Sequence, residues 1–130
     1  MTPNDRKYTK DHEWVLVEGN VARIGITDYA QHALGDIVYV ELPVVDDGCA
    51  AGDAFAVVES VKAVSSVFTP VSGTVTEANA ALEDEPQQLN ETPYESWIAL
   101  VEMSDEGEVD QLMDAEAYDA YVATLEESED

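Results

Sequence analysis

The chain has 130 residues, of which 45% are apolar, and a formal net charge of −24. This length and apolar share predict one folded domain over residues 1–130, because a disordered acidic polymer holds fewer apolar side chains. Nucleic acid and anionic membrane surfaces are excluded as partners, since binding to either requires clustered Lys and Arg side chains.

Acidic side chains outnumber basic ones by 29 to 5. This excess causes self-repulsion in dilute buffer, which molar salt relieves by cutting the Debye length to about 3 Å. We interpret the composition as adaptation to a salt-rich cytoplasm, as in halophilic organisms. A cytoplasmic location is also expected from the single Cys49, from the lack of a long apolar run and from the lack of a signal-peptide core in residues 1–11.

The first third of the chain predicts a hairpin, a short helix and a strand. Residues 14–17 and 21–26 are apolar and β-prone, and a turn sequence separates them. Thr27 then offers a helix N-cap, and residues 29–34 can form a short helix that a glycine closes. Residues 36–42 are predicted to form the next strand, which a proline ends.

The middle of the chain predicts a second hairpin. Residues 46–53 are loop-like, and the β-prone segments 55–58 and 64–68 follow them. Few residues separate the two segments, so a tight hairpin with Lys62 near its tip is expected. Residues 74–76 are predicted as a short strand that pairs with residues 55–58.

The last part of the chain predicts a strand and a helix. Residues 79–82 are expected to form a capped helical turn, residues 83–93 a polar loop and residues 96–103 the last strand. A β body of about residues 6–103 follows, as a compact antiparallel domain. An acidic helix over about residues 106–126 should pack on it, with residues 126–130 frayed, through the apolar stripe Val109, Leu112, Met113, Tyr121 and Leu125.

Lys62 is the only basic residue beyond residue 23. A solvated lysine is a cation at neutral pH and a poor nucleophile. Schiff-base chemistry requires desolvation or a neighbouring cation, and this acidic surrounding favours neither. The side chain is therefore better suited to being modified than to reacting.

Four segments of the sequence resemble the glycine cleavage H-protein family, in the family's order and spacing. They are residues 8–15, residues 25–43, the Glu-Ser-Val-Lys-Ala run at 59–63 with Pro-Val-Ser-Gly at 70–73, and residues 90–94. The resemblance covers about residues 6–103. It implies a mainly β fold, the lipoyl/biotinyl-type antiparallel β sandwich called a barrel-sandwich hybrid, with short helices and a C-terminal helix.

The resemblance also implies the site. Lys62 would carry lipoate as an N6-amide, and its neighbours Glu59, Ser60, Val61 and Ala63 would present it to a lipoylating enzyme. Glu13 is the candidate that shelters the arm by holding the protonated amine of its cargo, with His32 a distant second. The lysine of a biotinyl carrier would have methionine neighbours, which this sequence lacks.

By resemblance, the chain is a monomeric carrier without catalytic residues. It would pass an aminomethyl group from a pyridoxal-phosphate glycine dehydrogenase to a tetrahydrofolate-dependent aminomethyltransferase, and electrons to a dihydrolipoyl dehydrogenase. Three alternatives remain open. The chain could be a lipoate-relay or regulatory H-like protein, a lipoyl domain of a 2-oxoacid dehydrogenase, or an enzyme that uses Lys62 covalently.

Other candidate sites are weaker. Cys49 has no basic neighbour to activate its thiol and is interpreted as a small turn residue. His12 and His32 lack the spacing of a metal site, so no metal is expected. The acidic pairs at residues 46–47 and 126–127 arise from composition alone in a chain this acidic.

The sequence departs from the family pattern near its last strand and in the hairpin. Residues 95–96 precede Trp97 without the usual glycine, and residues 98–101 replace a common lysine with an apolar run. Ala56 stands where glycine is frequent. These differences bear on loop geometry and partner docking, and not on the attachment site.

Overall fold

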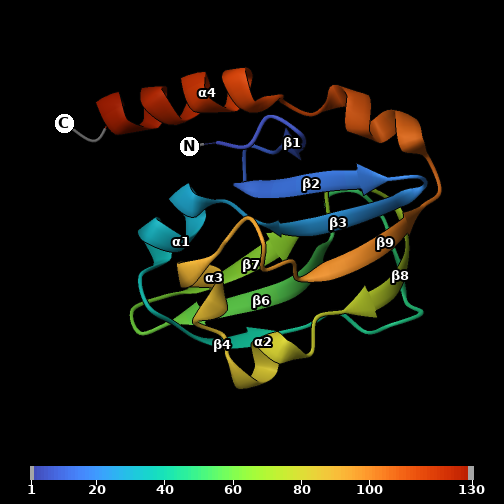
Figure 1. Cartoon of the computed structure of the whole chain (residues 1–130), viewed down its shortest axis with the longest axis horizontal. Coiled ribbons are helices and arrows are strands. Elements are labelled where there is room, and N and C mark those ends of the chain that lie inside the picture. The colour runs from blue at the N-terminus through green and yellow to red at the C-terminus, as the bar shows by residue number, and fades with distance from the viewer. Residues whose placement is uncertain (1, 129–130) are drawn as a thin grey trace.

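Figure 1 shows a computed structural model that describes residues 2–128, and in this part of the chain two antiparallel sheets pack face to face. The larger sheet has the strand order β1 (Lys7–Tyr8), β2 (Glu13–Glu18), β3 (Val21–Ile26), β9 (Ala99–Met103), β8 (Gly73–Ala78) and β5 (Gly48–Cys49). The smaller sheet consists of β4 (Ile37–Glu41), β6 (Ala54–Ser60) and β7 (Val64–Phe68). This is the antiparallel β sandwich that the resemblance predicts.

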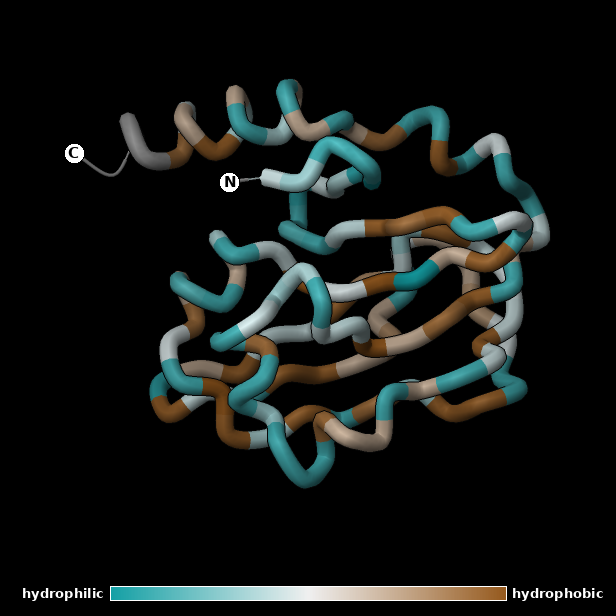
Figure 2. Tube along the Cα trace, viewed as in Figure 1, coloured by the Kyte–Doolittle hydropathy of each residue, from teal (hydrophilic) through white to brown (hydrophobic). Residues whose placement is uncertain are grey.

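The main core lies between the two sheets. Val15 and Ile24 of the larger sheet and Val40 and Val58 of the smaller sheet are at most 1% exposed. Strands bury alternate side chains, because successive side chains point to opposite faces. Figure 2 accordingly shows hydrophobic segments along the strands and hydrophilic ones in many of the outer loops.

The first hairpin and helix form as predicted. Strands β2 and β3 pair over their full length, with Trp14 opposite Gly25. Helix α1 (Asp28–Leu34) begins at the predicted cap, where Thr27 Oγ1 accepts a hydrogen bond from the Ala30 amide at 3.2 Å. The helix ends at a glycine with φ of 85°, a conformation that favours this residue.

Gly25 also has a packing role, because the Trp14 ring lies directly over it. A Cβ atom at Gly25 would be 2.5 Å from Trp14 Cζ2. Trp14 is fully buried and donates from Nε1 to the carbonyl of Pro93 at 3.0 Å, so the ring has little room to move. We expect Gly25→Ala to lower the free energy of unfolding by about 1–3 kcal/mol in urea denaturation. Gly48→Ala, whose nearest contact is 3.9 Å away, is the matched control and should change stability little.

The predicted pairing of residues 74–76 with residues 55–58 is wrong. Strand β8 instead pairs with β9, with Val75 opposite Val101, and with β5. Both edges of β6 are already occupied by β4 and β7, which leaves no edge for a third strand. Strand β5, within the loop predicted at residues 46–53, was not predicted.

Two short helices lie in the segment between β8 and β9. Helix α2 (Ala81–Asp84) begins two residues after the predicted start and has no side-chain cap, because its N-cap residue is Ala80. Asn79 Nδ2 instead donates to the carbonyl of Trp97 at 2.8 Å. Helix α3 (Gln88–Glu91) was not predicted and lies within the expected polar loop. Leu89 is fully buried and holds α3 on the main core.

The C-terminal segment is not one helix from residue 106. A 3₁₀ helix, η1 (Glu106–Gln111), and an α-helix, α4 (Ala115–Ser128), are separated by an extended bridge. In that bridge the amide of Met113 donates to the carbonyl of Tyr8 at 3.0 Å, and the amide of Tyr8 donates to the carbonyl of Met113 at 2.8 Å. Helix α4 continues through residues 126–128, where fraying was predicted, and residues 129–130 lie outside the described part.

A second, smaller core attaches α4 to the larger sheet. It contains Tyr8, Trp14, Ala115 and Tyr118, and the rings of the two tyrosines stack with centroids 4.8 Å apart. Figure 1 shows α4 lying outside β1 and β2, on the side away from the smaller sheet. No helix within residues 2–128 is long and apolar enough to cross a membrane.

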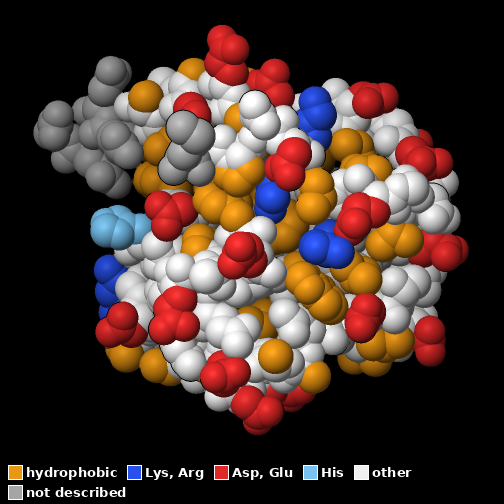
Figure 3. Space-filling model, viewed as in Figure 1, with side chains coloured by type: hydrophobic (Ala, Val, Ile, Leu, Met, Phe, Trp, Pro, Cys, Tyr) orange, Lys and Arg blue, Asp and Glu red, His pale blue; other side chains and the backbone are white. Residues whose placement is uncertain are grey.

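Acidic side chains spread over the surface without matching cations. Figure 3 shows many Asp and Glu side chains and few Lys or Arg on one face. Within residues 2–128 the ion pairs join Arg6 to Asp5 and Arg23 to Glu18. The charge repulsion predicted from composition is therefore not offset by local pairing.

We expect the fold to depend on salt. The far-ultraviolet circular dichroism spectrum in millimolar buffer should show partial or complete unfolding, and molar KCl should restore the β spectrum, because salt screens the repulsion between carboxylates. Sucrose, which stabilises folded proteins without screening charge, is the control and should restore less structure. Complete folding in low salt would contradict this expectation.

Candidate modification site at Lys62

Lys62 lies at the tip of the hairpin between β6 and β7, as predicted, and its side chain is exposed. Ser60 organises the turn. Its Oγ accepts hydrogen bonds from the amide of Lys62 at 3.3 Å and from the amide of Ala63 at 3.0 Å, and its own amide donates to the Ala63 carbonyl at 2.8 Å. The serine hydroxyl thus stabilises the turn by accepting backbone hydrogen bonds, so the turn does not need the Asn-Gly sequence that is common in tight hairpins.

The Lys62 side chain rests against the end of α1. A Cβ atom at Gly35 would lie 3.3 Å from Lys62 Cε, so a glycine at this position leaves room for the lysine chain. No ion pair in residues 2–128 involves Lys62. Lys62 is therefore exposed and forms no ion pair with a carboxylate of the described residues, although the surroundings are acidic.

A network of hydrogen bonds holds the segment at residues 35–37, which lies beneath the hairpin tip. The amide of Val61 donates to the carbonyl of Asp36 at 3.0 Å. Asn90 of α3 holds the same segment from the other side: Oδ1 accepts from the Ile37 amide at 2.9 Å, and Nδ2 donates to the Gly35 carbonyl at 2.8 Å. The tip is thereby connected to α1, β4 and α3.

The predicted presentation residues gather at the tip. Glu59 is the residue before Ser60 on β6 and pairs across the sheet with Tyr39 and Val64. Val61 is 70% exposed, and Ala63 is exposed as well. The structure therefore brings Glu59, Ser60, Val61 and Ala63 together around Lys62.

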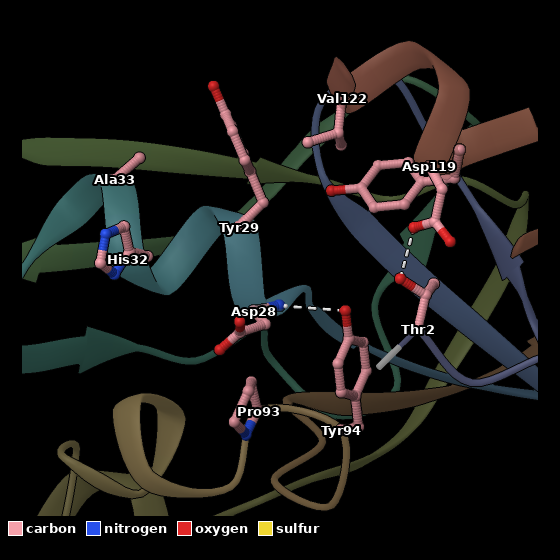
Figure 4. Close-up of a pocket in the computed structure, with 10 residues that line it drawn as sticks. Thr2, Asp28, Tyr29, His32, Ala33, Pro93, Tyr94, Asp119 and Val122 are labelled. Atoms are coloured by element: carbon pink, nitrogen blue, oxygen red, sulfur yellow. Dashed lines mark hydrogen bonds between the residues drawn. The ribbon is translucent and has the colours of Figure 1, made fainter. Parts of the chain in front are cut away.

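A pocket of about 730 Å³ lies between α1, α4 and the loop after α3 (Figure 4). Ten residues line it: Thr2, Asp28, Tyr29, His32, Ala33, Pro93, Tyr94, Tyr118, Asp119 and Val122. One wall is closed by a hydrogen bond from the amide of Asp28 to Tyr94 Oη at 3.2 Å. Sequence analysis missed this pocket, because its walls come from segments far apart in the chain.

Glu13 is buried, with only 2% of its surface exposed. Its Oε1 accepts a hydrogen bond from Thr9 Oγ1 at 2.6 Å, and its Oε2 accepts one from the amide of Phe68 at 3.2 Å. Burial raises the pKa of Glu13 to about 7, although both hydrogen bonds oppose the shift. Glu13 is therefore not a solvated surface acid like most of the other carboxylates. His32, but not Glu13, lines the pocket.

Comparison with known proteins decides the family. The family model described as glycine cleavage H-protein matches residues 6–125. This chain belongs to the glycine cleavage H-protein family. A glycine cleavage system H protein from Staphylococcus saprophyticus is 58% identical over 117 residues, which cover 89% of this chain and 93% of that protein. One from Thermoanaerobacter sp. is 58% identical over 115 residues, or 88% of this chain and 91% of that protein.

A solved structure agrees with this assignment. The crystal structure of a glycine cleavage system H protein from Mycobacterium marinum superposes with a TM-score of 0.85 at 38% identity. The match covers 93% of this chain and 98% of that one. The sandwich described above is therefore the fold of an H-protein family member.

The departures from the H-protein family pattern have local explanations. Ala56 is 3% exposed and adds its methyl group to the main core. Ser96 is buried, and its Oγ donates to the carbonyl of Gln88 at 3.1 Å, which fixes the loop before Trp97 without the usual glycine. Ile98 and Val101 are fully buried in the core.

His12 and Cys49, the weaker candidate site residues, contact neighbouring side chains. His12 Nδ1 lies 2.8 Å from Tyr118 Oη, and the His12 ring packs on Tyr29 at 4.4 Å between centroids. Burial lowers the pKa of His12 and raises that of Cys49, whose thiol faces Thr69. Within residues 2–128 no three His, Cys, Asp or Glu side chains gather as a metal site.

Proposed function

We propose that this chain, as a single domain, is the lipoyl-carrying shuttle protein of a glycine cleavage system, with lipoate in amide linkage to Nζ of Lys62. The observation that carries the proposal is an exposed lysine at a hairpin tip, which forms no ion pair within residues 2–128, in a chain of this family. When bound, lipoate supplies a dithiolane that takes up the aminomethyl group of glycine and two electrons.

The chain's own residues attach and place the arm. Ser60 fixes the turn, Gly35 leaves room for the lysine chain, and Asn90 secures the segment beneath. The chemistry belongs to the cofactor, so the protein acts as a non-catalytic carrier. Its partners are the decarboxylating glycine dehydrogenase, the aminomethyltransferase, the dihydrolipoyl dehydrogenase and a lipoylating enzyme. It works as a monomer in the cytoplasm.

The pocket beside α1 is within reach of the arm. A lipoyl-lysine arm extends on the order of 12–15 Å, and the seven residues of α1 span about 10 Å. The lysine chain already lies against the end of this helix. We therefore place the resting position of the loaded arm along α1, with His32 on the wall of the pocket.

The experiment that tests this function is reconstitution. The purified chain, lipoylated in vitro, should support glycine–bicarbonate exchange with the decarboxylating dehydrogenase in molar KCl, and peptide mass analysis should locate the lipoyl group on Lys62. A lipoylated chain without exchange activity would instead indicate a relay, a regulatory protein or a partner of a 2-oxoacid dehydrogenase. A chain that takes up no lipoate would contradict the carrier proposal itself.

We also propose that Glu13 protects the loaded arm in a second position outside the pocket beside α1, because a carboxylate can accept a charge-assisted hydrogen bond from a protonated amine. Glu13→Gln should shorten the lifetime of the aminomethyl-loaded protein by about tenfold, if one charge-assisted bond is lost. Release of formaldehyde and ammonia measures that lifetime. His32→Gln is the comparison variant, and an unchanged lifetime in Glu13→Gln would remove Glu13 from this role.

A further inference from the structure

Exposed large apolar side chains are unevenly distributed over the described residues. Seven are prominent: Val17, Val38, Tyr39, Val44, Val45, Val61 and Val64. Six of these lie between residues 38 and 64, and Val17 alone lies elsewhere. A chain with 29 acidic residues has ample polar side chains for its surface, so this concentration calls for an explanation.

Four of the exposed apolar side chains surround the tip that carries Lys62. Val61 and Val64, on either side of the lysine, are 70% and 68% exposed. Val38 and Tyr39 of β4 are 53% and 49% exposed. A register shift between Ile37 and Tyr39 explains why two consecutive residues of one strand both face solvent.

The sheet register places part of this set in one row. Tyr39 pairs with Glu59, and Glu59 pairs with Val64. Directly opposed residues in antiparallel strands share one face, with Cβ atoms about 5 Å apart. In the next row Val40 and Val58 are buried, so the row of Tyr39, Glu59 and Val64 lies on the outer face of the smaller sheet. We call Val38, Tyr39, Glu59, Val61 and Val64 the tip face.

We propose that the tip face is the docking surface for the lipoylating enzyme, with Tyr39 and Val64 as its apolar centre. This inference rests on the proposed function. The acidic side chains of Glu59 and of Glu41, which is exposed two residues further along β4, call for Lys or Arg at the rim of the partner. The occupant is therefore a protein with an apolar patch and a basic border.

The position of the reacting atom favours the lipoylating enzyme over the other partners. That enzyme must bring its active site to Nζ of Lys62, which is only about 6 Å from the backbone. Its surface must then cover the residues next to the tip. The other partners act at the far end of an arm that extends on the order of 12–15 Å, and they can work without contacting the tip face.

The test uses conservative changes on the tip face. Tyr39→Thr and Val64→Thr place threonine, a β-branched residue that suits exposed strand positions, and remove apolar surface. Val17→Thr, on β2 of the larger sheet, is the matched control. The unlipoylated full chain would be incubated with lipoate, ATP and a lipoate–protein ligase, and incorporation followed by intact mass at several chain concentrations.

The Tyr39→Thr/Val64→Thr double variant should show KM for the chain raised by about tenfold or more with kcat little changed, since loss of an aromatic anchor at an interface has this effect. Val17→Thr should behave as the wild type. Acylation of Lys62 by a small N-hydroxysuccinimide ester should proceed at the wild-type rate in every variant, because the amine itself is unaltered. Acylation at the wild-type rate would show that the variants weaken docking of the enzyme and do not distort the tip.

Four outcomes would overturn the inference. They are wild-type kinetics in the double variant, an equal loss of small-ester acylation, a defect confined to exchange with the dehydrogenase, and a wild-type dimer that the double variant abolishes. Failure of the proposed function has a different signature. In that case the wild-type chain would take up no lipoate, while the H protein of Staphylococcus saprophyticus does so under the same conditions.

Discussion

Lys62→Arg is expected to abolish lipoyl attachment and, with it, all glycine–bicarbonate exchange activity. Arginine keeps the positive charge and the exposure of the side chain, so the fold and the tip should be unchanged. Its guanidinium stays protonated in proteins and cannot form the amide. The variant thus removes the nucleophile without removing the cation.

The measurement is intact mass after incubation with ligase, ATP and lipoate, followed by the exchange assay. Lys10→Arg is the matched control, because Lys10 is another exposed lysine, located in the turn before β2. It should take up one lipoyl group and support full exchange. Lipoyl incorporation into the Lys62→Arg chain would show that the arm is attached elsewhere.

Glu13→Gln should change how stability depends on pH. Burial raises the pKa of Glu13 from 4.5 to about 7, so between these values the folded chain holds a proton that the unfolded chain has released. Glu13 therefore destabilises the fold progressively as pH rises from about 4.5 to about 7, and the full penalty applies above 7. Glutamine has no charge to desolvate and carries no such penalty.

We expect the stability difference between Glu13→Gln and the wild type to shift in favour of the variant by about 3 kcal/mol from pH 4 to pH 8, at 1.36 kcal/mol for each pKa unit. Urea denaturation in molar KCl at several pH values measures it. Glu77→Gln, on the exposed side of β8, is the control variant that removes one carboxylate without a buried site. Parallel pH profiles for Glu13→Gln and the wild type would contradict the assignment.

Local signals in the sequence were sufficient for elements whose hydrogen bonds are local. The hairpin of β2 and β3 and the cap at Thr27 follow from residues a few positions apart. For elements that depend on distant partners, the predictions were wrong or absent. Strand β8 was assigned to the wrong neighbour, because alternation does not specify which strand it meets.

The residues of the candidate site show the same difference between local signals and contacts with distant segments. The position of Lys62 at a hairpin tip could be predicted from the β-prone segments on either side of it, and Ser60 was named, although not for its role in the turn. The burial of Glu13 could not be predicted, because it results from Thr9 on one side and Phe68 of the other sheet. The pocket requires α1 and α4 to meet, which no local pattern indicates.

The backbone bridge between Tyr8 and Met113 has a consequence for how the protein is made. At about 5–20 residues per second, a ribosome needs on the order of ten seconds to add the residues that separate these two partners. During that interval the edge of β1 has no partner, whereas the nearby strands β6 and β7 can already close their hairpin. The lysine-bearing tip is therefore complete while the nascent chain still lacks the segment that seals its first strand.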